Sequence, residues 1–312
     1  MHIKTFAAAA VAALGLASAA HAGAGTITID GGAKMIYHRN VAASSVDASK
    51  TVGVITIHGT NRNADDYYDY TVRAASDAGE LGSTLIWVPE FEASSASGYA
   101  EWSSSGWKYG ENDDTSFAVS SFTAVDTLIR KMADKTKFPN LTKVVVIGHS
   151  AGGQFVQRYA AASTAFNTSG VDVVYIAANA GSYAYLTSHR WNGSAFTSTS
   201  HPTCTAFNTY RYGLTGLPPY LSAVGASTIV SQAPSRPVHL LNGTLDTGVD
   251  SDLDTGCEAN LQGSQRLERG RRYKSYMDAI FPGHSWTQTD VSGVGHDGED
   301  MIRSAAARAL IW

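Results

Sequence analysis

The 312-residue chain is poor in charged residues and in cysteine. Only 16% of the residues are charged, and 23 basic against 27 acidic side chains give a formal net charge of −4. This balance offers no strongly basic surface of the kind that binds nucleic acid. At 44% hydrophobic residues, the composition supplies a full globular core and is not typical of disorder.

Long apolar runs are missing from the chain after its first 22 residues. Within those residues, Lys4 supplies a positive charge, residues 6–16 are apolar, and Ala20 and Ala22 are small residues at cleavage-site spacing. The run is too short to span a membrane. We expect residues 1–22 to be a signal peptide rather than an uncleaved helix, and residues 23–312 to form one domain. The protein is then secreted or periplasmic, without a membrane anchor.

Cysteine occurs twice, as Cys204 and Cys257. An oxidising compartment favours a disulfide between them, closing a loop of some fifty residues. Two free buried thiols are the alternative. A metal site is less favoured, because no histidine or further cysteine stands at ligand spacing beside either residue. We expect no metal and no cofactor.

Short apolar segments rich in β-branched residues alternate with segments of helical periodicity. The predicted elements are a hairpin over 26–30 and 34–39, strands at 52–57, 84–88, 143–147, 171–177, 237–241 and 286–291, and helices at 65–78, 115–137, 151–162 and 299–310. This order indicates an α/β fold with a mostly parallel sheet covered on both faces. The long connection 182–236 lacks clear periodicity, and we interpret it as a cap-like or binding insertion.

The chemistry begins at Gly148-His149-Ser150-Ala151-Gly152, which matches G-x-S-x-G. The five letters alone are weak evidence in a chain with 30 glycines. Their context is stronger, because an apolar strand leads in and a helical segment leads out. Such a turn exposes the hydroxyl of Ser150, which we predict to be a nucleophile.

Acyl transfer needs two backbone N–H donors for the developing oxyanion. One donor is expected from Ala151, the residue after the nucleophile. The other is expected from the loop that follows the strand 52–57, where Thr60 is the first candidate and Asn61 the second.

A serine nucleophile needs a base, and in this arrangement an acid and then a histidine follow the serine in the chain. His296 comes after the last predicted strand, at the carboxyl edge where Ser150 also lies, and His284 is the alternative. Asp246 follows the strand 237–241 and is the expected acid. The nearby carboxylates Asp250, Asp252 and Asp254 are alternatives. Their spacing superficially suggests a calcium loop, but it lacks the required Gly and Glu, so a solvated acidic loop is favoured.

The His58-Gly59 loop, Gly148 to Gly152, Gly243 to Asp246 and Gly295-His296 together resemble the α/β-hydrolase superfamily. That resemblance implies a mostly parallel eight-stranded sheet with a Ser-Asp-His triad on loops at its carboxyl edge. The segments 178–183 and 262–266 are similar to exported microbial poly(aspartic acid) hydrolases and, more distantly, to polyhydroxybutyrate depolymerases. One group would cleave an amide polymer and the other a polyester.

Arginine is more frequent than lysine, and three arginines fall near the expected site. Arg62 lies beside the oxyanion loop, and Arg190 and Arg211 lie in the insertion. The planar guanidinium suits carboxylates, so we predict that these residues bind an anionic substrate; ordinary surface ion pairs are the alternative.

Three hypotheses for function follow. The first is a depolymerase for an anionic polyamide such as poly(aspartic acid), and the second is a carboxylesterase or polyester depolymerase. The third is a non-catalytic binding module on a hydrolase scaffold, which would leave a complete Ser, Asp and His set without a use.

Overall fold

The computed structural model describes residues 23–91, 97–167, 170–198 and 200–312. The expected signal peptide, residues 1–22, lies outside these residues. Within the described part of the chain, no helix combines the length and the hydropathy needed to cross a bilayer.

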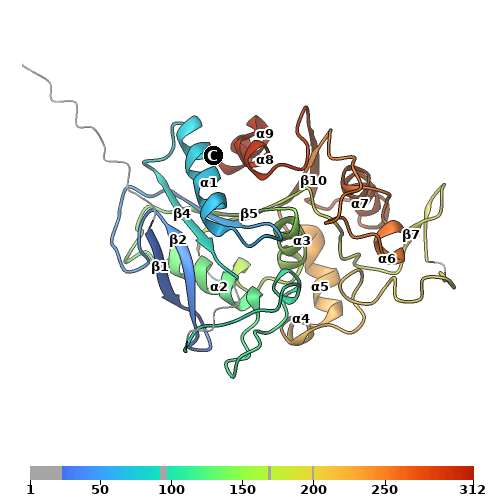
Figure 1. Cartoon of the computed structure of the whole chain (residues 1–312), viewed down its shortest axis with the longest axis horizontal. Coiled ribbons are helices and arrows are strands. Elements are labelled where there is room, and N and C mark those ends of the chain that lie inside the picture. Colours follow the sequence, from blue (N-terminus) through green and yellow to red (C-terminus); the bar gives the residue numbers. More distant parts are fainter. Residues whose placement is uncertain (1–22, 92–96, 168–169, 199) are drawn as a thin grey trace, which may run out of the picture.

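An eight-stranded sheet forms the centre of the molecule, in the order β1-β2-β4-β3-β5-β6-β9-β10 (Figure 1). Its strands are β1 (Gly23–Thr28), β2 (Lys34–Arg39), β3 (Val52–Ile57), β4 (Thr84–Pro89), β5 (Lys143–His149), β6 (Asp172–Ala178), β9 (Val238–Gly243) and β10 (Thr287–Val291). The β1–β2 hairpin is antiparallel and pairs antiparallel with β4, whereas the remaining strands run parallel. This is the mostly parallel eight-stranded sheet that the sequence predicts.

Helices cover both faces of the sheet. The helices are α1 (Ala64–Asp77), α2 (Ser121–Met132), α3 (Ala151–Ala162), α4 (Pro219–Val224), α5 (Ala226–Gln232), α6 (Cys257–Asn260), α7 (Arg266–Ile280), α8 (Gly298–Arg303) and α9 (Ala305–Ile311), with short 3₁₀ turns at Gly106–Tyr109, Ala165–Asn167 and Ala233–Ser235. In Figure 1, α1, α8 and α9 lie above the sheet, and α2, α3, α4 and α5 lie below it.

The packing of strand β5 explains why residues 144–147 are all apolar. Val144 and Val146 pack into the core on the α2 and α3 face, whereas Val145 and Ile147 pack into the core on the α1 and α8 face. Successive side chains of a strand point to opposite faces, so a strand covered on both sides needs apolar residues at every position.

The helices α4, α5, α6 and α7 lie where the sequence pattern predicts none. The buried face of α7 includes Arg266, Arg269 and Gly270, so it shows no apolar periodicity.

Two predicted helices have other bounds in the structure. The expected helix 115–137 is shortened at both ends to α2. Before it, Asp113 accepts hydrogen bonds from the N–H groups of Thr115 and Val119 and holds residues 115–119 as a loop, and after it Asp134 accepts the N–H of Thr136 in a turn. The expected helix 299–310 divides into α8 and α9 at Ser304, which is extended at φ −56° and ψ 150° and caps the N–H of Ala307.

The long connection between β6 and β9 contains α4, α5 and a two-residue hairpin of β7 (Arg190–Trp191) with β8 (Phe196–Thr197). Leu221 of α4 and Ile229 of α5 are buried in the same core as α3. The helical part of the insertion therefore packs beside the α3 layer of the sheet.

Candidate active site

Ser150 lies in a sharp turn between β5 and α3. Its backbone has φ 59° and ψ −117°, a left-handed conformation that costs a non-glycine residue about 1–3 kcal/mol. The turn places the hydroxyl at the carboxyl end of the sheet and at the N-terminus of α3.

The glycines on either side make this turn sterically feasible. A Cβ atom at Gly148 would overlap the carbonyl oxygen of Gly152, and a Cβ at Gly152 would overlap the carbonyl oxygen of Ile57. The close approach of β3, β5 and α3 therefore excludes any side chain at Gly148 and at Gly152.

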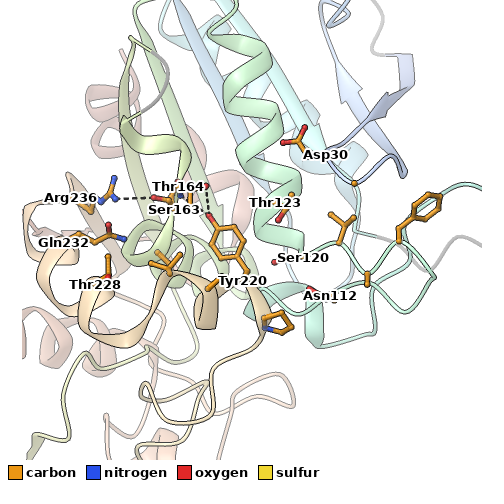
Figure 2. Close-up of a pocket in the computed structure, with 18 residues that line it drawn as sticks. Asp30, Asn112, Ser120, Thr123, Ser163, Thr164, Tyr220, Thr228, Gln232 and Arg236 are labelled. Atoms are coloured by element: carbon orange, nitrogen blue, oxygen red, sulfur yellow. Dashed lines mark hydrogen bonds between the residues drawn. The ribbon is translucent and has the colours of Figure 1, made fainter.

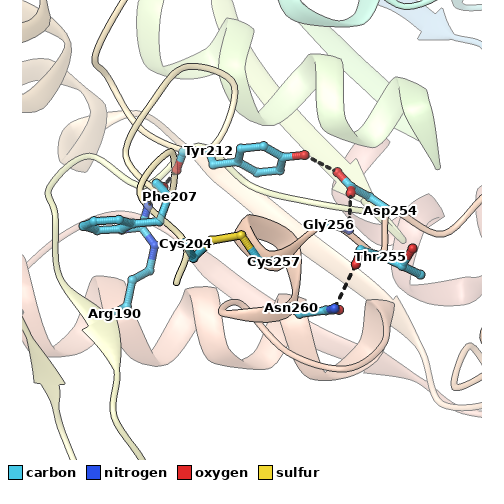
Figure 3. Close-up of a disulfide and its surroundings, with 9 residues drawn as sticks. All are labelled: Arg190, Cys204, Phe207, Tyr212, Asp254, Thr255, Gly256, Cys257 and Asn260. Atoms are coloured by element: carbon cyan, nitrogen blue, oxygen red, sulfur yellow. Dashed lines mark hydrogen bonds between the residues drawn. A yellow bond between two sulfur atoms is a disulfide. The ribbon is translucent and has the colours of Figure 1, made fainter. Parts of the chain in front are cut away.

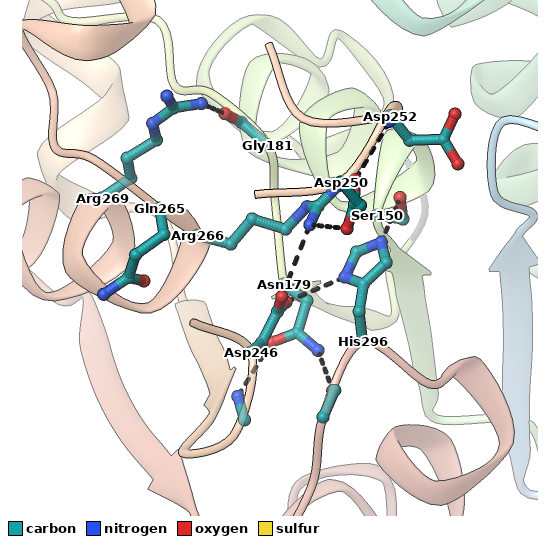
Figure 4. Close-up of polar contacts among 12 residues, drawn as sticks. Ser150, Asn179, Gly181, Asp246, Asp250, Asp252, Gln265, Arg266, Arg269 and His296 are labelled. Carbon is teal, nitrogen blue, oxygen red and sulfur yellow. Dashed lines mark hydrogen bonds and ion pairs between the residues drawn. The ribbon is translucent and has the colours of Figure 1, made fainter. Parts of the chain in front are cut away.

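The structure brings Ser150, His296 and Asp246 together from three separate turns (Figure 4). His296 Nε2 lies 2.9 Å from Ser150 Oγ, and His296 Nδ1 lies 2.8 Å from Asp246 Oδ2. Asp246 is almost fully buried, whereas the His296 side chain is 24% exposed. The imidazole can therefore accept a proton from the serine on one side while it donates to the carboxylate on the other.

The loop after β3 has a fixed orientation next to Ser150. The carbonyl oxygen of Gly59 lies 2.9 Å from the ring Nδ1 of His58 and accepts the N–H of Arg62 at 3.2 Å. Since the carbonyl and N–H of a trans peptide point in opposite directions, the N–H of Thr60 points away from these two groups. Ala151 is the first residue of α3, whose N–H has no acceptor within the helix.

A cleft of about 230 Å³ opens at these residues. Its lining comprises Gly59, Thr60, Asn61, Asn63, Tyr67, Tyr70, His149, Ser150, Asp252, His296, Asp297 and Gly298. Both oxyanion candidates of the loop, Thr60 and Asn61, belong to it. A larger hollow of about 730 Å³ lies among α2, α4 and α5 and shares no lining residue with this cleft (Figure 2). The triad geometry, and not size, identifies the reactive cleft.

Behind Asp246 lies an ion pair that the sequence reasoning missed. The buried Arg266 donates two hydrogen bonds to Asp250, at 2.7 and 2.9 Å, and approaches Asp246 Oδ1 at 3.5 Å. These bonds lower the pKa of Asp250 to about 2. Arg266 therefore lies between the two carboxylates and occupies the oxygen of Asp246 that faces away from His296. A fully buried arginine needs hydrogen-bond acceptors, and only the folded structure shows that Asp250 and Asp246 are the acceptors of Arg266.

His149 lies directly against the catalytic histidine candidate. The two rings are 4.7 Å apart between centroids, and His149 Nδ1 lies 3.1 Å from the hydroxyl of Tyr67. Burial lowers the pKa of His149 well below its usual range, and the neighbouring His296 and Arg266 lower it further. His149 is thus a neutral, packed neighbour of His296 at neutral pH.

The three arginines expected to bind substrate are placed differently from one another. Arg190 is 1% exposed, and its guanidinium donates to the carbonyl oxygens of residues 187, 189, 207 and 212 while it stacks on Tyr185. This arginine holds the insertion together and does not face the cleft. Arg62 donates to the carbonyl oxygen of Trp102 beside the cleft. Arg211 stacks on the ring of Tyr109 at 4.7 Å.

The acidic segment after Asp246 is held by separate partners. Asp250 pairs with Arg266, Asp252 lines the cleft, and Asp254 accepts the hydroxyl of Tyr212 at 2.6 Å (Figure 3). These carboxylates are thus directed to different neighbours. The disulfide between Cys204 and Cys257 joins the insertion to the end of this segment, 53 residues apart in the chain.

The predicted alternative base lies elsewhere. His284 Nε2 is 3.0 Å from Asp278 on the far end of α7, and its Nδ1 accepts the N–H of Trp286. The structure therefore brings His296, and not His284, to Ser150.

Comparison with known proteins supports a hydrolase fold along almost the whole chain. Residues 54–311 match the family model described as the alpha/beta hydrolase family. A search of curated protein sequences finds no significant match.

Among solved structures, poly(aspartic acid) hydrolase-1 from Sphingomonas sp. KT-1 is similar at a TM-score of 0.67 and 24% identity, over 93% of this chain and 98% of that chain. The LpqC poly(3-hydroxybutyrate) depolymerase from Bordetella parapertussis gives a TM-score of 0.65 and 21% identity, over 94% and 95%. An S-formylglutathione hydrolase from Agrobacterium tumefaciens gives 0.51 and 12%, over 93% and 95%. These likenesses concern the fold, and with the family match they lead to one conclusion: the chain belongs to the α/β-hydrolase family.

Proposed function

We propose that this protein is an exported serine hydrolase that cleaves carboxylic ester or amide bonds through an acyl-enzyme. The observation that carries the proposal is the continuous chain of hydrogen bonds from Ser150 through His296 to Asp246, at 2.9 and 2.8 Å. These are the distances that proton transfer between a nucleophile and its base requires.

In the proposed reaction, Ser150 Oγ attacks the substrate carbonyl carbon while His296 Nε2 takes the hydroxyl proton. Asp246 keeps the proton of His296 on Nδ1 and stabilises the imidazolium. The N–H groups of Thr60 and Ala151 bind the oxyanion of the tetrahedral intermediate. His296 then protonates the leaving alcohol or amine, and a water activated by His296 releases the acid from Ser150.

The test is reaction with a fluorophosphonate probe, which labels an activated serine. The native protein is expected to be labelled at Ser150 and to hydrolyse nitrophenyl esters, whereas Ser150→Ala should do neither and keep its thermal melt. Ser222→Ala, at an exposed serine of α4, is the matched control. A native protein that is not labelled, or a Ser150→Ala variant that turns over substrate, would refute the proposal.

Export is the second part of the proposal. It is supported by the signal-peptide pattern in residues 1–22 and by a disulfide, which persists in oxidising compartments. N-terminal sequencing of the protein from the culture medium or periplasm should start near Gly23. A protein that keeps Met1 and stays in the cytoplasm would contradict this part alone.

An anionic polymer such as poly(aspartic acid) is the first substrate candidate, and a cluster of cations supports it. Lys108, Arg158 and Arg211 surround the ring of Tyr109 at 5.4, 5.2 and 4.7 Å from its centroid. Arg158 is 1% exposed and donates to the carbonyl oxygens of Gln154, Ser182 and Arg211, so it contributes positive charge from beneath the surface. Lys108 and Arg211 are partly exposed, and within the described residues neither forms an ion pair with a carboxylate. Burial lowers the pKa of Lys108, and repulsion from Arg211 and Arg158 lowers it further.

This cluster is close enough to the cleft for a polymer to reach. Arg158 is eight residues beyond Ser150 on α3, about 12 Å along the helix. An extended chain spans that distance with three or four units. A carboxylate-bearing polymer bound at Ser150 would therefore present further carboxylates to Lys108 and Arg211, which lie beside Arg158 around Tyr109, whereas a short substrate would not.

A neutral ester or polyester is the second candidate, because the cleft itself carries negative charge. Asp252 and Asp297 line it beside Ser150. Two carboxylates at the scissile bond repel a polyanion and leave an uncharged acyl chain unaffected.

Parallel assays on poly(aspartic acid), polyhydroxybutyrate and nitrophenyl esters separate the two candidates. For the first candidate, Lys108→Ala with Arg211→Ala should raise KM for poly(aspartic acid) at least fivefold, and salt should do the same in the native protein. Lys274→Ala, at a lysine paired with Asp278 on α7, is the control. Cleavage of polyhydroxybutyrate alone would favour the second candidate.

A further inference from the structure

The segment that ends β6 contacts all three turns of the proposed triad. The carbonyl oxygen of Ala178 accepts the N–H of Ser150 at 3.0 Å. The next residue, Asn179, is fully buried and has φ 45°, a left-handed conformation that asparagine tolerates better than most side chains. This backbone directs its amide into the space between the acid turn and the histidine loop (Figure 4).

One end of the Asn179 amide holds the acid turn. Its Oδ1 accepts the N–H of Gly243 at 2.8 Å, at the end of β9. The carbonyl oxygen of Gly243 in turn accepts the N–H of Asp246 at 3.1 Å. The Oδ1 atom is therefore one hydrogen bond away from the turn that carries the carboxylate.

The other end of the amide holds the histidine loop. Asn179 Nδ2 donates to the carbonyl oxygen of Gly295 at 3.0 Å, in the peptide group that leads into His296. Its second hydrogen faces His149 Nε2 at 3.4 Å. When His149 accepts there, its proton stays on Nδ1, beside the hydroxyl of Tyr67. Asparagine, with one acceptor and two donor hydrogens on a short side chain, satisfies all three neighbours.

From this geometry we infer that Asn179 is a positioning residue, whose amide fixes the acid turn and the histidine loop relative to Ser150. The inference rests on the proposed function of the triad and adds a residue that touches neither substrate nor the reacting atoms. Removal of the amide frees two loops that otherwise meet through backbone contacts such as Leu245 N–H to Val294 O, at 2.9 Å. A displacement of about 1 Å in a catalytic group can cost a hundredfold in rate.

The test compares Asn179→Ala and Asn179→Asp with the native enzyme on a nitrophenyl ester. Asn179→Ala removes every bond of the amide. Asn179→Asp keeps an acceptor for Gly243 N–H but faces Gly295 O with an oxygen. We expect both variants to lower kcat at least tenfold, to change KM less than threefold and to slow fluorophosphonate labelling by the same factor as kcat. The nearly isosteric Asp variant carries the test if the Ala variant does not fold.

Gln262 provides a matched control for the loss of a buried amide. It is fully buried, its Oε1 accepts the N–H of Tyr183 at 2.8 Å, and its Nε2 donates to the carbonyl of the same residue at 2.8 Å. Gln262→Ala should lower Tm comparably and keep kcat within threefold of the native enzyme, because these bonds hold no turn of the triad.

Two kinetic results overturn the inference, and equal labelling rates of the native and Asn179→Ala proteins are a third. One is a folded Asn179 variant with kcat within threefold of the native enzyme, and the other is a parallel loss of kcat in Gln262→Ala. Labelling separates this failure from failure of the proposed function. If the native protein is not labelled, the serine-hydrolase function fails, and if native and Asn179→Ala proteins are labelled at equal rates, only the role of Asn179 fails.

Discussion

Replacement of Asp250 by asparagine removes the negative charge that pairs with Arg266 behind Asp246. The asparagine side chain has nearly the same shape as the aspartate that it replaces. In the native protein, hydrogen bonds from Arg266 lower the pKa of Asp250 from 3.8 to about 2. At about 1.4 kcal/mol per pKa unit, that difference corresponds to at most about 2.4 kcal/mol of stability at neutral pH. The Asp250 side chain is 45% exposed, so solvent screening reduces the expected value to about 1–1.5 kcal/mol.

The arginine side of the pair adds a second cost. Arg266 is 1% exposed, and without Asp250 its guanidinium keeps only Asp246, at 3.5 Å, as a charged partner in the described part of the chain. Loss of one member of a fully buried pair costs about 3–5 kcal/mol, but Asp246 retains part of that interaction. We therefore expect Asp250→Asn to lower the free energy of unfolding by about 2 kcal/mol at pH 7, and Tm by roughly 3 °C.

The stability difference between native protein and Asp250→Asn should decrease as the pH falls. A carboxylate whose pKa is lowered by folding stabilises the protein above the pKa of the unfolded chain, here 3.8, and loses that effect as pH falls toward 2. The part of the difference that comes from Asp250 ionisation should be complete at pH 6 and about halved at pH 3.

Urea unfolding of both proteins between pH 7 and pH 3 measures the difference. Asp290→Asn is the control, since Asp290 forms a similar pair with Arg271, whose side chain is 52% exposed, and should cost less than about 1 kcal/mol. Equal stability of Asp250→Asn and native protein at pH 7, or a difference that does not shrink at pH 3, would refute the reasoning.

Three further predictions concern other parts of the molecule. Ser150→Gly relieves the left-handed strain and should raise the free energy of unfolding by about 1 kcal/mol while abolishing turnover, as urea unfolding and ester assays would show. Cys204→Ser with Cys257→Ser opens a 53-residue loop and should cost up to about 4 kcal/mol, measured by thermal unfolding against the oxidised native protein. Burial lowers the pKa of His58 to about 4, so the unfolded chain takes up a proton below pH 6.5 that the folded chain does not. The contribution of His58 to stability should therefore fall by about 2 kcal/mol between pH 7.5 and pH 5, in addition to that of the buried His149, and urea unfolding should show that His58→Gln removes the His58 part.

The sheet and the reactive residues are predictable because their signals are local or follow from topology. The strand and helix around Ser150 lie within a few residues of the motif. Asp246 and His296 could be located because parallel strands end at one edge of the sheet, so the loops after β9 and β10 must meet near Ser150. Their roles in catalysis remain the subject of the proposal.

What the sequence could not show depends on contacts between distant residues. The residues next to Arg190 in the sequence do not indicate that carbonyl groups between residues 187 and 212 enclose its guanidinium. From the sequence alone, an arginine at this position is expected at the surface. The pairing of Arg266 with Asp250 and the span of Asn179 between Gly243 and Gly295 likewise appear only after β6, β9 and β10 are placed side by side. Residues that position a site are harder to find than residues that react.

The left-handed turn at Ser150 has a consequence for how this protein can be engineered. Folding alone would be served better by glycine at this position, because glycine adopts positive φ without a Cβ penalty. A library selected only for resistance to heat will therefore enrich variants with glycine in place of Ser150. These variants lack the hydroxyl and are inactive. Selection on this scaffold has to demand turnover in every round, since here stability and reactivity favour different residues.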